Sequence, residues 1–210
     1  MLQLFNTIAT LGTFVVIAAT AIAAVIQLRH MRSSNQIAAL NELRETMDNA
    51  EFALSQHFVL TGLAHKLEDP AFRYQLANRS ARTGENQRLI TSVVSVGNLY
   101  ENMGVLVKSG LVDKSRALDL WWNVTAMAWE ALEPCVAIFR RKQGDTIYEN
   151  FEYLTVLARG WVAAHPRGAF PYGLRRVDIQ DRWLAADEEY AASLPRTEVG
   201  TVNVVTLDVR

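Results

Sequence analysis

The chain opens with an unbroken apolar stretch. From Met1 to Leu28 the sequence holds no Asp, Glu, Lys, Arg or His. A helix over residues 2–28 would rise about 40 Å, which exceeds the roughly 30 Å of a bilayer core. The pattern therefore predicts one transmembrane helix. A cleaved signal peptide is the competing interpretation, but the basic segment that normally precedes the apolar stretch of such a peptide is missing.

Charged residues beside this stretch predict how the chain is oriented. Arg29 and Arg32 follow it directly, and no Lys or Arg precedes it. Because basic flanks stay on the cytoplasmic side, we expect a single-pass protein of the bacterial inner membrane with its N-terminus outside and its C-terminal domain in the cytoplasm. Arg29 and Arg32 are also candidate contacts with lipid headgroups, so the bilayer is one expected partner.

Beyond the anchor, apolar residues recur at steps of three and four, which is the period of an α-helix face. The first such pattern begins near Ser34, almost continuous with the anchor, and ends near Gly62 or Lys66. Its apolar face includes Ile37, Leu40, Met47, Leu54 and Phe58. Residues 70–84 indicate a short helix and then a loop. Two long helical faces follow, made of Leu89, Val93, Val96, Tyr100, Met103 and Val107, and of Leu118, Trp122, Thr125, Trp129, Leu132, Val136 and Phe139.

Residues with strong helix-end preferences bound the second half of the chain. Asp113 is a good N-cap, and Gly144 ends the helix that Asp113 begins. Pro134 inside that helix predicts a kink, or a stop about a turn before it. Residues 146–149 fit a capping box that opens a fourth helix. A last amphipathic helix is expected from about residue 178 to 194.

These elements predict an all-α fold in which one transmembrane helix precedes a cytoplasmic bundle of about four to five helices. The expected divisions are an anchor over 1–28, a basic junction over 29–34, a cytoplasmic helical domain over 35–194 and a short irregular tail over 195–210. Apolar residues alternate at period two over 202–209. An edge strand, a partner-binding segment and a mobile terminus all stay open for this tail.

Composition narrows the function classes. The 21 Lys and Arg residues against 22 Asp and Glu give a net charge of −1, so no nucleic-acid partner is expected. Cys135 is the single cysteine, which suits a reducing compartment, and its apolar helical surroundings predict a buried structural thiol. His57 and His65 lack partners at ligand spacing, so we expect them on a helix surface and expect no metal site.

Glu101 is the most notable polar residue, because it lies mid-helix on a stripe with Gly97 and Gly104. These glycines admit the close approach of another backbone. One interpretation is a buried acid that contacts a ligand or metal. The favoured interpretation is structural: Glu101 and its neighbour Asn98 satisfy helix ends or pair with an arginine of another helix. The candidate ligand-contacting or buried polar residues are Glu101, Asn98, Asn102 and Arg140.

Two stretches resemble a known family. Residues 98–113 resemble the central signature of a bacterial family known as a domain of unknown function, and residues 129–134, Arg140 and residues 148–154 are similar to its second half. The resemblance covers roughly residues 35–160. It implies a membrane-anchored α-helical fold and brings no activity, cofactor or catalytic residue with it.

Motifs that carry chemistry are missing from the sequence: no Glu is followed by His at the spacing of di-iron bundles, and no Gly-x-Ser-x-Gly or phosphate-binding glycine loop occurs. We therefore expect a non-enzymatic, membrane-tethered interaction or scaffold module without a cofactor, which binds a protein partner or self-associates as a homo-oligomer. The first alternative is a membrane-anchored sensor or effector that binds a small ligand near Tyr100, Glu101, Trp122 and Trp129. A membrane-bound enzyme is the third hypothesis.

Overall fold

The computed structural model describes residues 2–193, except for the side chains of Leu2 and residues 4–10. Helices and their connections make up this range, and it contains no strand. The predicted all-α fold class, with a long apolar N-terminal helix ahead of a helical region, is confirmed. The chain divides into two units, Met1–Ala169 and Phe170–Arg210.

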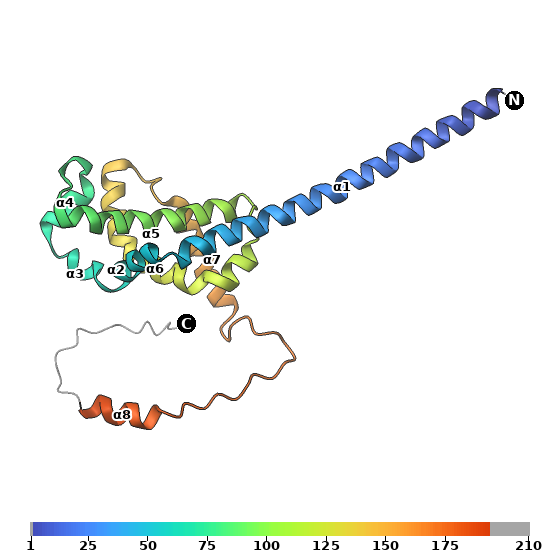
Figure 1. Cartoon of the computed structure of the whole chain (residues 1–210). Coiled ribbons are helices and arrows are strands. Elements are labelled where there is room, and N and C mark those ends of the chain that lie inside the picture. Colours follow the sequence, from blue (N-terminus) through green and yellow to red (C-terminus); the bar gives the residue numbers. More distant parts are fainter. Residues whose placement is uncertain (1, 194–210) are drawn as a thin grey trace. The chain divides into compact units, whose positions relative to one another are not determined.

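Helix α1, Leu2–Asp48, is the longest element of the first unit (Figure 1). It passes through residues 29–34 without a break, so the expected continuity between the apolar stretch and the next helix is observed. Ala39 and Leu43 are buried, and Leu40 and Met47 pack against the same core. The end of α1 therefore belongs to the bundle.

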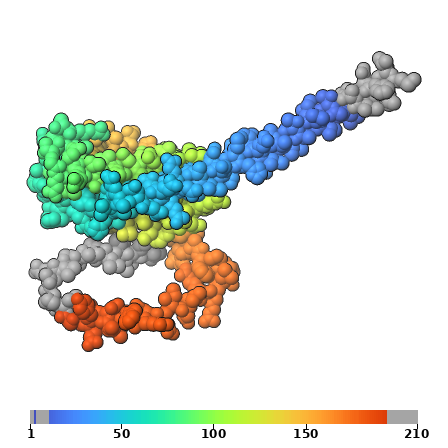
Figure 2. Space-filling model, in the orientation of Figure 1, coloured from blue at the N-terminus to red at the C-terminus, as the bar shows by residue number. Residues whose placement is uncertain are grey.

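No other segment of the first unit covers the apolar half of α1 (Figure 2). In the described part of the chain, α1 is the one helix long and apolar enough to cross a membrane, a property that a signal sequence shares. Its large apolar side chains are exposed, including Leu11, Phe14, Ile17, Ile22 and Val25. Such exposure distinguishes it from a core helix of similar composition.

A helix break at Asn49 corrects the prediction of one helix reaching to Gly62 or Lys66. Asn49 has extended backbone angles, and its side chain accepts hydrogen bonds from the backbone N–H groups of Glu51 and Phe52. This cap begins α2, Ala50–Thr61. The break also changes the buried face, because Phe52 is buried in α2 whereas Leu54, on the predicted face, is 71% exposed.

Short elements lead from α2 to the central helix α5. They are α3 (Leu63–Lys66), α4 (Pro70–Ala77) and the 3-10 turn η1 (Arg79–Ala81), and they match the short helix and loop expected after residue 70. Helix α5, Gly84–Lys108, packs against α2, α4, α6 and α7. Its predicted face is confirmed, since Val93, Val96, Tyr100, Met103 and Val107 are buried and Leu89 packs against them.

Helix α6, Lys114–Gln143, begins with Asp113 as its N-cap and ends at Gly144, as predicted. It continues through Pro134, so the expected stop before that residue is wrong. Leu132 and Cys135, on either side of the proline, are buried. Packing of both sides against the core holds the helix together where the proline removes one backbone hydrogen bond.

Helix α7, Glu149–Ala164, packs along α5 and α6 and ends at His165, as predicted. The tryptophans differ in their burial. Trp129 is buried, whereas Trp121, Trp122 and Trp161 are partly exposed. Trp183, in the second unit, is 71% exposed.

The described part of the second unit, residues 170–193, holds α8, Leu184–Ser193. This helix starts later than the predicted residue 178, and none of its residues is buried. The start follows a side-chain turn, since Asp181 Oδ1 accepts from the Trp183 N–H. Ile179 precedes the helix and is 90% exposed. The predicted tail, residues 195–210, lies outside the described residues.

Candidate functional site

Gly97 and Gly104 on α5 allow the beginning of α7 to lie directly against the α5 backbone. A Cβ added at Gly104 would lie 2.1 Å from the carbonyl oxygen of Asn150, and one at Gly97 would lie 2.8 Å from the ring of Tyr148. Both distances are shorter than real carbon contacts. The close backbone approach predicted for this glycine stripe is therefore present, and it fixes where α7 begins.

Glu101 lies between these glycines and caps α7. One carboxylate oxygen accepts from the backbone N–H groups of Asn150 and Phe151 at 3.1 and 2.8 Å, and the other accepts from the Asn150 side chain at 2.7 Å. The negative charge also suits the positive end of the helix dipole. The structural interpretation of Glu101, that it satisfies a helix end, is the arrangement observed.

This contact corrects the predicted capping box over residues 146–149. No side chain of that segment caps α7, and Tyr148 occupies the N-cap position in the left-handed conformation, with φ of 59°. A carboxylate from α5 supplies the cap that a local threonine was expected to supply. A residue distant in sequence therefore caps α7, although residues 146–149 match the pattern of a local capping box.

The contact of Gly97, Glu101 and Gly104 with the start of α7 is called the Glu101 junction below. The other predicted polar residues lie at different places relative to it. Asn98 Oδ1 accepts from the Tyr148 hydroxyl at 3.3 Å, so Asn98 and Glu101 do lie together. Asn102 is exposed and lines a 450 Å³ groove between α1 and α5 instead. Arg140, a possible arginine partner of Glu101, instead donates to the Ile147 carbonyl at 2.9 Å and pairs with Glu152 at 2.6 Å.

Tyr148 is the side chain around which the junction is organised. Burial raises the pKa of its phenol to about 12, the charge of Glu101 acts in the same direction, and Arg79 and Arg82 act against it. The ring packs against Phe139 with 6.0 Å between centroids. Tyr148 therefore keeps its proton at neutral pH and donates to Asn98.

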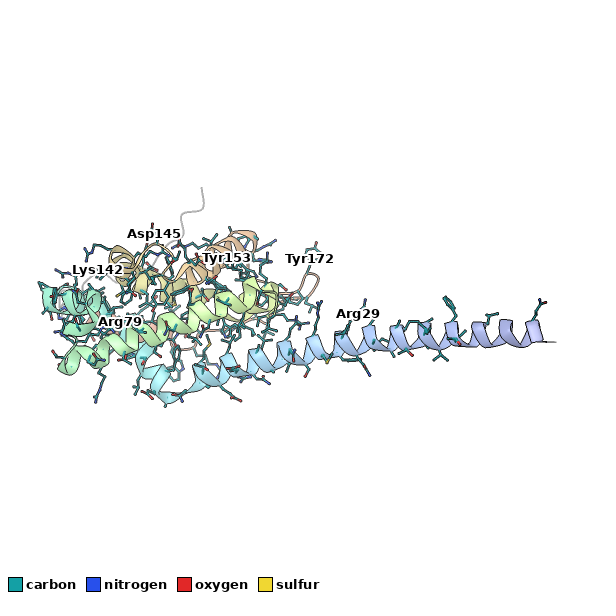
Figure 3. All side chains as sticks on the ribbon, turned by 90° about the horizontal axis from the view of Figure 1, so that it is seen from above. Arg29, Arg79, Lys142, Asp145, Tyr153 and Tyr172 are labelled. Carbon is teal, nitrogen blue, oxygen red and sulfur yellow. The ribbon has the colours of Figure 1, made fainter. Side chains whose placement is uncertain are left out.

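A polar crevice of 270 Å³ opens beside Tyr148. Its polar lining is Arg79, Arg82, Asn98, Glu101, Gln143, Thr146 and Tyr148. Arg82 donates to the carbonyls of Gln75 and Leu76 at 3.3 Å. Burial and the neighbouring charge of Arg79 lower the pKa of Arg82. Figure 3 labels Arg79 at the end of the bundle that also carries Lys142.

The chemistry of this crevice suits a small anion. The guanidinium groups of Arg79 and Arg82 and the Thr146 hydroxyl offer the donors that carboxylate and phosphate oxygens accept, and the two positive charges outnumber the one carboxylate of the lining, Glu101. Among the described residues, no group of three or more His, Cys, Asp or Glu side chains could hold a metal ion. Sequence reasoning missed this crevice, although the arginines of residues 73–82, in a segment with few large apolar side chains, were a visible signal.

The aromatic residues expected to line a ligand site pack against other rings. Tyr100 is fully buried and stacks on Phe151 at 4.9 Å, and the same phenylalanine receives the edge of Trp129 at 5.0 Å. Trp122 lies elsewhere, stacked on Trp161 at 5.6 Å. These five rings are parts of the α5–α6–α7 packing.

The remaining candidate residues have the predicted exposures. His57 and His65 are exposed on α2 and α3. Cys135 is fully buried, and burial raises the pKa of its thiol to about 12. A thiol of this kind is inert at neutral pH, because the thiolate is the reactive form.

Comparison with known proteins gives one match. A family model described as a domain of unknown function (DUF4760) matches residues 14–160. No curated protein and no solved structure matches the chain. The matched range starts further towards the N-terminus than the resemblance in the sequence suggested, inside the apolar half of α1. It extends through the Glu101 junction into α7.

Proposed function

The chain belongs to the family described as a domain of unknown function (DUF4760), and we propose that it acts as a membrane-tethered interaction module. In this proposal the apolar half of α1 crosses the bacterial inner membrane once. The helical bundle then binds protein partners, including further copies of the chain, and catalyses no reaction. The observation that carries the proposal is the environment of α1.

The apolar half of α1 exposes large side chains on every side. Four successive residues, Phe14, Val15, Val16 and Ile17, are each 59–71% exposed. Successive helical residues point about 100° apart, so these four together span the circumference of the helix. Such a helix is stable in hydrocarbon rather than in water. Since α1 continues into the bundle, a lipid-embedded α1 would hold the bundle beside the bilayer.

The orientation in this proposal follows from Arg29 and Arg32, which are exposed at the end of the apolar stretch. With basic residues on the cytoplasmic side, the bundle lies in the cytoplasm and the two arginines lie at the headgroups. Replacing both with glutamate is expected to lower the fraction of chains with this orientation.

Fractionation and labelling of the full chain test the tether. We expect the chain to remain in membranes after an alkaline wash and to keep its full mass, whereas release or removal of the apolar segment would overturn the tether. A cysteine at exposed Ser109 is expected to react with an impermeant reagent only after the cells are opened. Labelling in intact cells would contradict the orientation. Cys135 is buried and should contribute little background.

An exposed apolar face on α6 supports the interaction role. Leu120 is 63% exposed and Met127 is 46% exposed. They lie seven residues apart, which places them on the same side of the helix. A 320 Å³ hollow beside Leu120 is also lined by Trp121, Leu40 and Met47. Exposed apolar positions grouped in this way are typical of protein interaction surfaces.

Cross-linking in native membranes tests self-association through this face. We expect cross-linked oligomers of the unaltered chain, and we expect Leu120→Asp/Met127→Asp to reduce them. Leu54→Asp is the matched control, because Leu54 is equally apolar and 71% exposed on α2. A chain that stays monomeric and retains no protein partner, or equal losses in both variants, would contradict the proposal.

A ligand sensor is the second candidate function, and the crevice beside Tyr148 favours it. Small carboxylates and phosphates are the expected ligands, and the change they cause would reach α7 through the Glu101 cap. A thermal-shift series with anionic metabolites tests this, with stabilisation expected for the unaltered chain and lost in Arg79→Gln/Arg82→Gln. A series without any stabilisation would remove this candidate.

A further inference from the structure

Three helices meet at the end of the bundle from which α1 leaves. The connection from α5 to α6, residues 109–113, is short, so α6 begins close to where α5 ends. Leu40 of α1 lines the same hollow as Leu120 and Trp121 of α6. Figure 3 places Arg29 beyond this end and Lys142 at the opposite end of the bundle. The start of α6 therefore lies at the end nearest the apolar half of α1.

The distance from this end to the apolar stretch is short. Leu40 and Leu120 line the same hollow, and both helices run inward from the same end (Figure 1). Ser34 lies six residues before Leu40, and Lys114 lies six residues before Leu120. Ser34 and Lys114 are therefore at the same level along the two helices. Ser34 follows Leu28 by about 9 Å along the helix. A bilayer has roughly 5–8 Å of headgroup region beyond each face of its hydrocarbon core, so the side chain of Lys114 is long enough to reach the headgroups.

The first turn of α6 carries charges that the helix itself does not favour. Lys114 and Arg116 are exposed there, and the turn has no acidic residue. The N-terminal end of a helix dipole is positive and disfavours cations. Asp113, the N-cap, is engaged with the Arg116 N–H and the Ser115 hydroxyl, and Asp119, one turn after Arg116, is the next acidic residue. Helix formation therefore does not account for the two cations.

We propose that Lys114 and Arg116 bind anionic lipid headgroups, so that this end of the bundle docks on the membrane surface. With Arg29 and Arg32 on α1, four exposed cations lie on the side of the headgroup layer, and Asp113 and Asp119 are the exposed acidic residues within one turn of Arg116. Docking would orient the bundle on its tether instead of leaving it free to tilt. The inference rests on the proposed membrane tether.

Fluorescence quenching of the full chain in nanodiscs tests the docking. A fluorophore on a cysteine at Ser109 reports the end near α6, and one at Ser80, beside Arg79, reports the opposite end. The discs contain phosphatidylcholine alone or mixed with phosphatidylglycerol, with a small share of headgroup-quencher lipid in both. We expect stronger quenching at Ser109 in the anionic discs and no difference at Ser80.

Matched variants on one helix separate docking from general charge. Lys114→Gln/Arg116→Gln removes two cations near the membrane, and Arg141→Gln/Lys142→Gln removes two at the far end of α6. We expect the first pair to lower the ratio of docked to undocked chains about fivefold for each cation, because a Lys or Arg near an anionic surface gains about 1 kcal/mol. The second pair should leave the ratio unchanged.

Each result has one meaning. Lipid-independent quenching at Ser109, or equal losses in the two variants, would overturn the docking while leaving the tether intact. Failure of the chain to enter the nanodiscs would overturn the tether itself. The melting temperature of Lys114→Gln/Arg116→Gln should be equal to or above that of the unaltered chain, since two unfavourable charges leave the helix start. A clear drop would mean that the two residues serve folding, and would overturn the docking.

Discussion

Two helical glycines, Gly104 and Gly160, differ in what their α-carbons face. Gly104 faces the backbone of Asn150, and Gly160 has no heavy atom within 4 Å of an added Cβ. We expect Gly104→Ala to lower the free energy of unfolding by about 1–3 kcal/mol or more, because backbone cannot move aside as a side chain does. Gly160→Ala should raise it by about 0.5–1 kcal/mol. Denaturant titration in detergent measures both, and similar values would contradict the close contact.

The phenol of Tyr148 makes stability depend on alkaline pH. Burial raises its pKa from the usual 10.0 of a tyrosine to about 12, so the folded chain holds a proton that the unfolded chain releases. Stability is then complete below pH 10 and falls as the pH rises from 10 towards 12. Tyr148→Phe should make the free energy of unfolding fall less steeply with pH over this interval. A residual slope is expected, since burial also raises the pKa of Tyr100 and Cys135; an unchanged slope would contradict the assignment.

At the scale of elements, the break between α1 and α2 depends on one side chain. Asn49 accepts two backbone N–H groups of α2, and loss of such a cap costs about 0.5–2 kcal/mol. Asn49→Ala should therefore lower the free energy of unfolding by that amount. Asn41→Ala is the matched control, because Asn41 is exposed inside α1, where alanine is a better helix former. Equal effects of the two substitutions would show that the cap does not set the break.

The sequence predicted elements whose apolar rhythm is unbroken, and it missed those that depend on distant partners. The faces of α5 and α6 follow from three-and-four spacing alone. The break at Asn49 was hidden because the same rhythm continues across it, with Leu54 in place although Phe52 is the residue that packs. Only the fold itself shows which of two apolar faces meets α5.

The candidate site likewise contains residues that the sequence indicated and residues that it did not. Glu101 and its two glycines stand out along α5, because a carboxylate between glycines is unusual on a buried helix. Arg79 and Arg82 belong to a different segment, and their place beside Tyr148 depends on how α4 and η1 pack. Thr146 matched a local capping motif, but Glu101 provides the cap. Local patterns identify side chains that can cap a helix, and tertiary packing decides which one does.

At the scale of the whole molecule, the proposed tether and the bundle share one helix without a hinge. The apolar half of α1 and the buried residues Ala39 and Leu43 belong to a single element. A continuous helix transmits rotation and tilt along its length, whereas a flexible junction would not. If the apolar half lies in a bilayer, clustering or rearrangement of the bundle would therefore turn the membrane helix with it.

Distance measurements between the two parts of the chain test this rigid connection. With spin labels on cysteines at Ala24 and Ser109, the unaltered helix should give one narrow distance distribution in nanodiscs. Ser34→Pro should broaden it, because proline inside a helix removes a hydrogen bond and clashes with the preceding turn. Ser34→Ala is the control for the loss of the exposed serine and should keep the distribution narrow. A broad distribution in the unaltered chain, equal to that of Ser34→Pro, would mean that residues 29–34 act as a hinge and that the bundle moves independently of its tether.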